Sequence, residues 1–234
     1  MPDDWQRALV VAAHPDDIEY GMAAAVAVWT GAGKEVHYLL ATRGEAGMAG
    51  VPPGEAGPLR EDEERRSAAV VGVTEVEFLD HRDGVLVQGP ELRRDLAAAI
   101  RRHRPELVVT GYFGATWTPP GGSPGYLNSA DHRALGQCVL DAVADASNEW
   151  IFPELEEPRW SGVQYIAVQD MSAPAHEVDV SAHVEAAVAS LSEHRRYLEI
   201  LSDVPVEEQA RQVIDMATMT EDGRRRVGFR LFWG

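Results

Sequence analysis

The sequence has little cysteine and few basic residues, and both shortages restrict what the protein can be. Cys138 is the only cysteine among 234 residues, so neither an intramolecular disulfide nor a metal site built from several cysteines can form. Lysine and arginine number 21 against 38 aspartates and glutamates, which gives a formal net charge of −17. Because such a charge repels phosphate, we expect no nucleic-acid partner and no binding to anionic membrane surfaces.

Long hydrophobic runs are also missing. No stretch approaches the roughly 20 apolar residues that span a bilayer. The amino terminus, MPDDWQRALVVAAH, opens with acidic residues, and its apolar run is too short for a signal peptide. We therefore expect a cytoplasmic protein with no membrane partner. The hydrophobic content of 45% is enough for a sizeable core, and we expect one domain over residues 1–234.

Short apolar runs alternate with helical patterns through the first two thirds of the chain. The pattern predicts buried strands at 8–13, 36–42, 76–80 and 106–111. It predicts helices at 17–32, 59–71, 91–103 and 131–146, with long loops at 44–57 and 115–129. Strands at 164–170 and 176–181 and helical patterns at 181–201 and 207–219 follow. This alternation predicts a Rossmann-like α/β fold, a mostly parallel sheet with helices on both faces and additional carboxyl-terminal strands and helices.

Polar residues gather where the predicted strands end, which is where ligands bind in such sheets. His14, Asp16 and Asp17 follow the first strand, and their spacing places His14 and Asp17 near each other with Asp16 pointing elsewhere. Asp131 and His132 open the helix after the loop at 115–129. Taken alone, each element could be an aspartate helix cap with a neighbouring histidine. Their occurrence together favours a metal site.

Three motifs carry a resemblance to a known family. AHPDDIEYG, TRGEAG and ADHRALG, in this order and spacing, resemble the LmbE/PIG-L family of zinc-dependent N-acetylglucosaminyl deacetylases, from about Ala8 to the carboxyl end. The resemblance implies a metal held by His14, Asp17 and His132, with Asp16 as the general base. It also implies that Arg60 and Asp83 contact the substrate. Relatives often form oligomers, so a homo-oligomer is also expected.

The segment that contains Asp131 and His132 departs from the family pattern. Many relatives have His-Pro-Asp-His there, whereas this chain has Ser129 at the first of those positions. A serine cannot serve as an imidazolium acid, so another oxyanion donor is required, and Tyr126 in the preceding loop is the predicted catalytic substitute. A surface role for this loop aromatic stays open. Asp131 either orients His132 or a neighbouring group through a hydrogen bond, or is a helix cap.

Two imidazoles and one carboxylate leave coordination positions open, as catalytic zinc sites do. Zn²⁺ is therefore the expected cofactor, and Fe²⁺ is the alternative because the same ligand set also binds ferrous iron. We expect a small-molecule N-acyl amine substrate, an N-acetylated amino sugar or a related compound, to be deacetylated. The alternatives are an amidase cleaving a thiol-cofactor conjugate and a non-catalytic Rossmann-like ligand-binding protein. The first turn lacks the Gly-x-Gly-x-x-Gly of dinucleotide sites.

The other histidines carry weaker signals. His81 lies on the same rim as Asp83 and could contact substrate. Five histidines lie on predicted strands or helices, and we do not expect them to be metal ligands: His37, His103, His176, His183 and His194.

Overall fold

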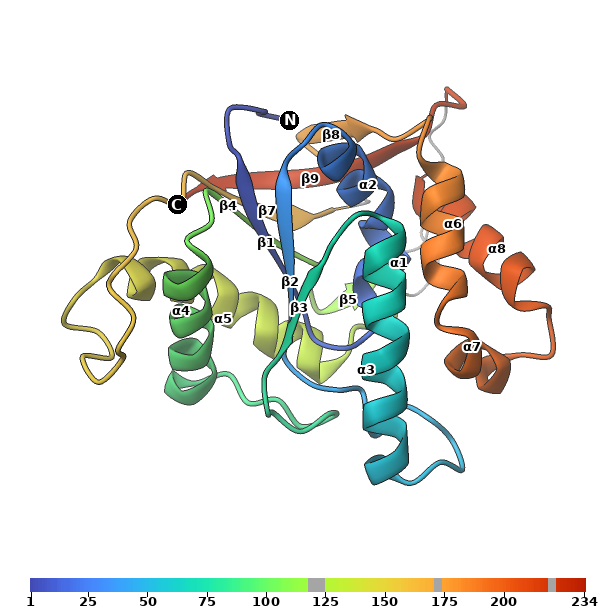
Figure 1. Ribbon diagram of the computed structural model, residues 1–234, viewed down its shortest axis with the longest axis horizontal. Coiled ribbons are helices and arrows are strands. Elements are labelled where there is room, and N and C mark those ends of the chain that lie inside the picture. The colour runs from blue at the N-terminus through green and yellow to red at the C-terminus, as the bar shows by residue number, and fades with distance from the viewer. Residues whose placement is uncertain (118–124, 171–173, 219–221) are drawn as a thin grey trace.

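The computed structural model describes residues 1–117, 125–170, 174–218 and 222–234, and most of its strands form one seven-stranded sheet (Figure 1). The strand order is β3-β2-β1-β4-β7-β9-β8. The strands are β1 (Arg7–Ala12), β2 (Glu35–Leu40), β3 (Glu75–Phe78), β4 (Leu107–Thr110), β7 (Tyr165–Gln169), β8 (His176–Asp179) and β9 (Arg226–Trp233). The first five in the order are parallel, and β9 is antiparallel to both of its neighbours. The predicted mostly parallel sheet is confirmed.

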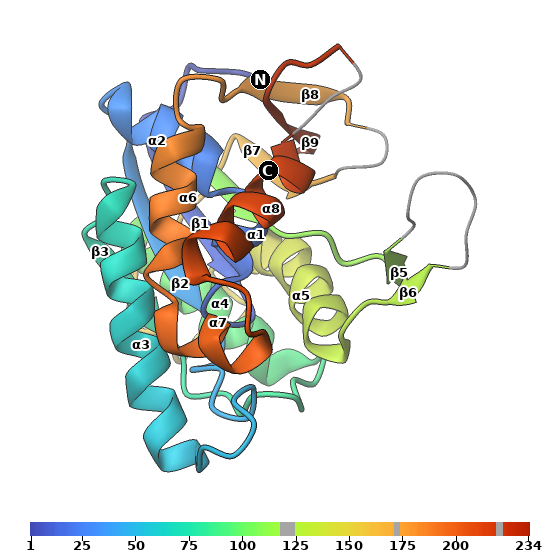
Figure 2. The ribbon, with the colours of Figure 1, turned by 90° about the vertical axis from the view of Figure 1, so that its right-hand side faces the viewer.

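Helices cover both faces of this sheet, which also confirms the prediction (Figures 1 and 2). One face carries α1 (Asp17–Gly21), α2 (Ala23–Gly31), α3 (Pro53–Val70), α6 (Val184–Ser192), α7 (Arg195–Leu201) and α8 (Val206–Thr218). The other carries α4 (Pro90–His103) and α5 (Ala130–Ser147). Alternate residues of β1 enter the two cores, with Val10 on the first side and Leu9 and Val11 on the second. A strand buried on both faces gives the continuous apolar run seen in the sequence.

Several elements differ in extent from the sequence prediction. The helix expected at 17–32 is divided at Met22, whose backbone leaves the helical region between α1 and α2. Helix α3 begins at Pro53, so the loop expected at 44–57 is shorter than predicted. A proline fits the first turn of a helix because its missing N–H would have no intrahelical partner there. The helical pattern at 181–201 is likewise divided into α6 and α7.

The loop expected at 115–129 contains a short hairpin of β5 (Thr116–Trp117) and β6 (Tyr126–Leu127), which Figure 2 shows projecting from the body of the protein. The proline and glycine run of this loop lies in 118–124, outside the described residues. Among the helices of the described part of the chain, none has the length and apolar character needed to cross a membrane.

Candidate active site and metal centre

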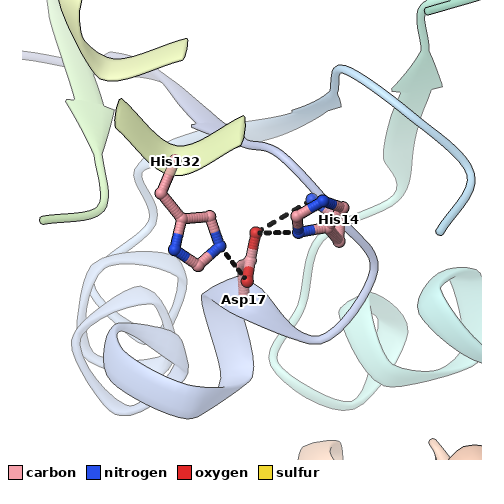
Figure 3. Close-up of side chains that lie close together, drawn as sticks. All are labelled: His14, Asp17 and His132. Carbon is pink, nitrogen blue, oxygen red and sulfur yellow. Dashed lines mark hydrogen bonds and ion pairs between the residues drawn. The ribbon is translucent and has the colours of Figure 1, made fainter. Parts of the chain in front are cut away.

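The predicted metal ligands come from two elements that lie far apart in the sequence and meet beyond the carboxyl end of β1 (Figure 3). His14 and Asp17 lie in the turn from β1 into α1, and His132 lies in the first turn of α5. Nδ1 of His14 is 3.3 Å from Oδ2 of Asp17, and Nε2 of His132 is 2.9 Å from Oδ1 of the same carboxylate. One ligand atom of each residue lies within 4.8 Å of the others. Their function as ligands stays a prediction.

The ring nitrogens that face away from Asp17 also have polar partners. Nε2 of His14 is 3.1 Å from both Asp83 and Asp131, and Nδ1 of His132 is 2.8 Å from Oδ1 of Asn128. Histidine ligands usually donate this second ring N–H to a carboxylate or carbonyl oxygen, which fixes the tautomer and orients the ring. The donor set and its supports therefore fit a divalent cation.

Asp131 was predicted either to orient His132 or a neighbouring group, or to cap the helix. Its carboxylate contacts the imidazole of His14 and not that of His132. Its carboxylate also accepts hydrogen bonds from the backbone N–H groups of Gly84 and Leu86, at 2.7 and 3.0 Å. The helix cap is supplied by Ser129, whose hydroxyl accepts a hydrogen bond from the His132 N–H at 3.0 Å. The serine that replaces the histidine of many relatives thus starts α5.

Negative charge dominates the electrostatics of this cluster. Burial lowers the pKa of His14, but Asp17, Asp131 and Asp83 outweigh that effect and raise the pKa to about 12. Burial likewise opposes ionisation of Asp17, yet His132 and His14 hold the pKa of its carboxyl far below the usual range. Three carboxylates around two imidazoles leave a surplus of negative charge, which a divalent cation would neutralise.

Asp16 is buried beside the cluster and does not share its orientation. Its backbone is left-handed, with φ of 91°, which is uncommon for a residue other than glycine. Oδ1 of Asp16 is 3.2 Å from the guanidinium of Arg60. Burial raises the pKa of Asp16 to about 6, while Arg60 opposes the rise and Asp17 adds to it. A carboxyl group with a pKa near neutrality suits a general base.

The TRGEAG segment holds two other predicted site residues in position. Arg60 donates to the carbonyl oxygens of Gly44 and Pro15, and a side chain at Gly44, whose φ is +62°, would collide with the guanidinium. Asp83 accepts from the N–H of Ala46 at 2.8 Å and donates its own N–H to Glu45 at 2.9 Å. Arg60 is only 2% exposed and its contacts are to the protein itself, so substrate binding by Arg60 stays a prediction.

A cavity of about 570 Å³ is lined by six of the predicted site residues, which are His14, Asp16, Asp17, Arg60, Asp83 and His132. The wall includes residues that the sequence did not single out: Tyr20, Tyr112, Gln169 and Tyr197. Tyr112 and Gln169 lie at the carboxyl ends of β4 and β7, so the rule that identified His14 could have found them. Tyr197 lies on α7, and its ring covers the guanidinium of Arg60 at 4.1 Å. No local signal in the sequence indicates which face of that helix meets the cavity.

The hairpin and the residues that join it to α5 contribute to the cavity wall. Trp117 and Ser129 both line the wall, and the ring of Trp117 lies 5.1 Å from Tyr112 and 6.4 Å from His132. Tyr126, opposite Trp117 in the hairpin, is 77% exposed and is not among the described residues that line the cavity. Its predicted function as oxyanion donor stays untested by this geometry.

Comparison with known proteins gives consistent matches. The model of the PIG-L family, described as GlcNAc-PI de-N-acetylase, matches residues 9–143, which contain all three predicted metal ligands. The chain is 34% identical over 146 residues to diacetylchitobiose deacetylase of Thermococcus kodakarensis, covering 62% of this chain and 51% of the relative. It is 29% identical over 167 residues to a probable N-acetyl-α-D-glucosaminyl L-malate deacetylase of Bacillus anthracis, covering 68% and 66%. These matches span between half and two thirds of the relatives' own length.

Solved structures give the same fold. N,N'-diacetylchitobiose deacetylase of Pyrococcus horikoshii superimposes with a TM-score of 0.81 at 24% identity, covering 98% of this chain and 84% of that one. A conserved protein of Thermus thermophilus superimposes with a TM-score of 0.73 at 26% identity, covering 95% and 92%. The mostly parallel α/β architecture is therefore shared with both.

Proposed function

The chain belongs to the PIG-L family, and from that premise we propose that it is a metal-dependent deacetylase acting on the amide nitrogen of an N-acetylated amino sugar or a related small molecule. One observation carries the proposal: His14, Asp17 and His132 converge at the cavity wall, with the buried carboxyl group of Asp16 beside them. The substrate class is supported by two relatives. The one from Thermococcus is named as a deacetylase and the one from Bacillus as a probable deacetylase, both of N-acetylglucosamine-containing compounds.

We assign Zn²⁺ as the cation and keep Fe²⁺ as the alternative, because two imidazoles and one carboxylate suit both. Nδ1 of His14, the carboxylate of Asp17 and Nε2 of His132 would hold it. When bound there, a divalent cation supplies a Lewis acid that polarises the amide carbonyl and acidifies water. Asp83 and Asp131 hold the imidazole of His14 in position through its Nε2 atom.

Asp16 moves the proton in this proposal. Its carboxylate removes a proton from the attacking water as the bond to the carbonyl carbon forms. The same carboxyl group then delivers that proton to the amide nitrogen as the C–N bond breaks, which releases acetate and a free amine. Arg60 keeps the carboxylate in place through the contact at 3.2 Å.

The cavity wall would bind the sugar. The aromatic rings of Tyr112, Trp117 and Tyr197 offer apolar faces, and Asp83 in the same wall would accept a hydrogen bond from a sugar hydroxyl. We keep Tyr126 as the proposed oxyanion donor. Replacing Tyr126 with phenylalanine would then lower the turnover rate with little change in metal content or substrate affinity. The variant Tyr112→Phe is the comparison, because Tyr112 is a tyrosine that lines the cavity.

Metal analysis combined with an acetate-release screen across N-acetyl amino sugars tests the proposed function. The wild-type protein is expected to bind metal and to release acetate from at least one member of the series. His132→Ala should lose the metal held by His14, Asp17 and His132, and with it the release of acetate. Metal-loaded protein that releases acetate from none of these compounds would contradict the proposed substrate class.

A further inference from the structure

A second group of metal-binding side chains lies at the amino-terminal ends of the parallel strands, the opposite end from His14. His37 lies on β2, Glu75 begins β3, and His103 ends α4. The register pairs His37 with Glu75 on one side and with Leu9 of β1 on the other. One ligand atom from each of His37, Glu75 and His103 lies within 4.8 Å of the others.

The inward-facing atoms of this group are spaced as the ligands of one cation would be. Nδ1 of His37 lies 2.8 Å from Nδ1 of His103 and 3.1 Å from Oε2 of Glu75, and Nδ1 of His103 lies 3.8 Å from the same oxygen. In a tetrahedral zinc site with Zn–N bonds of about 2.0–2.1 Å, neighbouring ligand atoms are about 3.3 Å apart. The three observed separations lie on either side of that value, so shifts of a few tenths of an ångström would suffice.

The outward-facing ring nitrogens have carboxylate partners, which leaves the two inward-facing Nδ1 atoms free to bind a cation. Nε2 of His37 lies 2.9 Å from Glu35, and Nε2 of His103 lies 2.7 Å from Glu77. An Nε2–H group that donates to each carboxylate leaves both Nδ1 atoms as acceptors. Two acceptor lone pairs that face each other at 2.8 Å repel unless a positive charge lies between them. The same carboxylate–histidine arrangement orients ligands in known metal sites.

The carboxylates that contact the two imidazoles are themselves paired with arginines. Arg7 pairs with Glu35 at 3.0 Å, and Arg102 pairs with Glu77, so both supporting carboxylates are fixed. The His37 and His103 side chains are only 12% and 10% exposed, whereas Glu75 is 63% exposed. In the described part of the chain, the ion pairs of Glu75 are with these two imidazoles. The two imidazoles are therefore largely buried in the protein, and Glu75 closes the group on the side that is open to solvent.

We propose that His37, Glu75 and His103 form a second binding site, for a divalent transition-metal cation. Imidazole and carboxylate ligands suit Zn²⁺ and its first-row neighbours, and three protein ligands leave one position for water. A cation there joins β2, β3 and the end of α4. The site lies at the opposite ends of the parallel strands from the cavity, and it does not depend on the proposed deacetylation.

Binding stoichiometry tests this site directly. Metal-stripped full-length protein is dialysed against Zn²⁺, and bound zinc is counted by elemental analysis. We expect two equivalents for the wild type, one for His103→Gln, one for His132→Ala and none for the double variant. Glu75→Gln changes an exposed side chain and should bind the second equivalent at least tenfold more weakly. His176→Gln, which belongs to neither cluster, is the matched control and should bind two.

Thermal unfolding in the His132→Ala background gives a second readout. Zinc at a free concentration of one hundred times the dissociation constant should raise the melting temperature by roughly 5–10 °C. The rise should disappear when His103→Gln is added. If wild type and both variants of this cluster, His103→Gln and Glu75→Gln, bind the same number of zinc ions with the same affinity, the proposal is overturned. If His103→Gln loses an equivalent but His132→Ala does not, the second site stands and the catalytic assignment fails.

Discussion

At the scale of single residues, Asp16 and Asp17 are neighbours in the sequence with different surroundings. Asp17 faces the imidazoles of His14 and His132, whereas the carboxylate of Asp16, whose backbone is left-handed, faces Arg60. A strained backbone at a functional residue persists only when its neighbours hold it. Here the Asp16 N–H donates to Glu64 at 3.1 Å and the Asp16 carbonyl accepts from Tyr20 at 2.9 Å.

These surroundings predict opposite effects for the same substitution at the two positions. Asp16→Asn should keep the metal and lower the turnover rate by roughly 10²–10⁴-fold, because it removes the general base. Asparagine also tolerates the left-handed backbone, so the local fold should survive. Asp17→Asn should release metal, because it removes a charged ligand. Elemental analysis and turnover measured on the same preparations check this, and the reverse pattern would exchange the two assignments.

Arg60 offers a second test at this scale, because its position admits two functions. As the partner of Asp16, it should affect turnover, so Arg60→Lys should lower the rate on the order of 10²-fold with metal content unchanged. Arg43→Lys is the matched control, since Arg43 pairs with Glu61 and Asp80. A raised KM with unchanged kcat in Arg60→Lys would instead support substrate binding as its main function.

At the scale of elements, the start of α5 decides how His132 is presented. Ser129 caps the helix, and the side-chain oxygen of Asn128 contacts Nδ1 of the imidazole while its amide nitrogen donates to the carbonyl groups of Tyr112 and Gly114. The cap fixes where the helix begins. The asparagine fixes which nitrogen of His132 points to Asp17.

Substitution of these two adjacent residues should separate helix stability from metal affinity. Ser129→Ala should lower the free energy of unfolding by about 1 kcal/mol, because it removes the cap, and it should leave metal affinity nearly unchanged. Asn128→Ala should weaken metal binding by about 10–100-fold, because it frees the ring of His132. Chemical unfolding and metal titration of both variants check this. Equal losses of metal affinity would show that the cap, and not the asparagine, orients the ring.

At the scale of the whole molecule, a buried cluster of titratable side chains joins the carboxyl-terminal helices to the first half of the chain. His194, between α6 and α7, lies 3.5 Å from both Glu19 of α1 and Glu64 of α3, and all three side chains are fully buried. Burial lowers the pKa of His194, but the two glutamates raise it to about 9. The cluster adjoins Asp16, whose N–H donates to Glu64.

The raised pKa of His194 predicts how stability depends on pH. The folded state holds this proton more tightly than the unfolded state, so the stabilisation is complete below about pH 6.5 and is lost as the pH rises through about 9. The free energy of unfolding should fall by on the order of 3 kcal/mol over this range. Urea unfolding at several pH values measures it. His194→Gln should be less stable but should show a smaller fall, and an equal fall in the variant would assign the effect to other groups.

The sequence alone predicted the fold class correctly and singled out the residues of the candidate site. Apolar runs such as ALVVAA predict strands buried on both faces because every residue of such a strand meets a helix layer. The residues that follow these strands must share one edge of a parallel sheet, so His14, Asp16 and Asp17 could be placed together from their order. Helix boundaries followed less directly from the sequence, because neither the start of α2 after Met22 nor that of α3 at Pro53 has a side-chain cap that the sequence could signal.

Only the tertiary structure decided the contacts between residues far apart in the sequence. The contact of His14 with Asp131 spans 117 residues, and that of His132 with Asp17 spans 115. No local pattern in the sequence predicts the contact of Arg60 with Asp16 or that of Asn128 with His132. The same holds for the contact of His37 with His103. The physical reason is that secondary structure depends largely on residues close together in the sequence. The direction of a side chain at a site depends instead on how separate strands and helices pack. The sequence therefore supplied the residue types of the candidate site, and packing decided which ring nitrogens and carboxylates face one another.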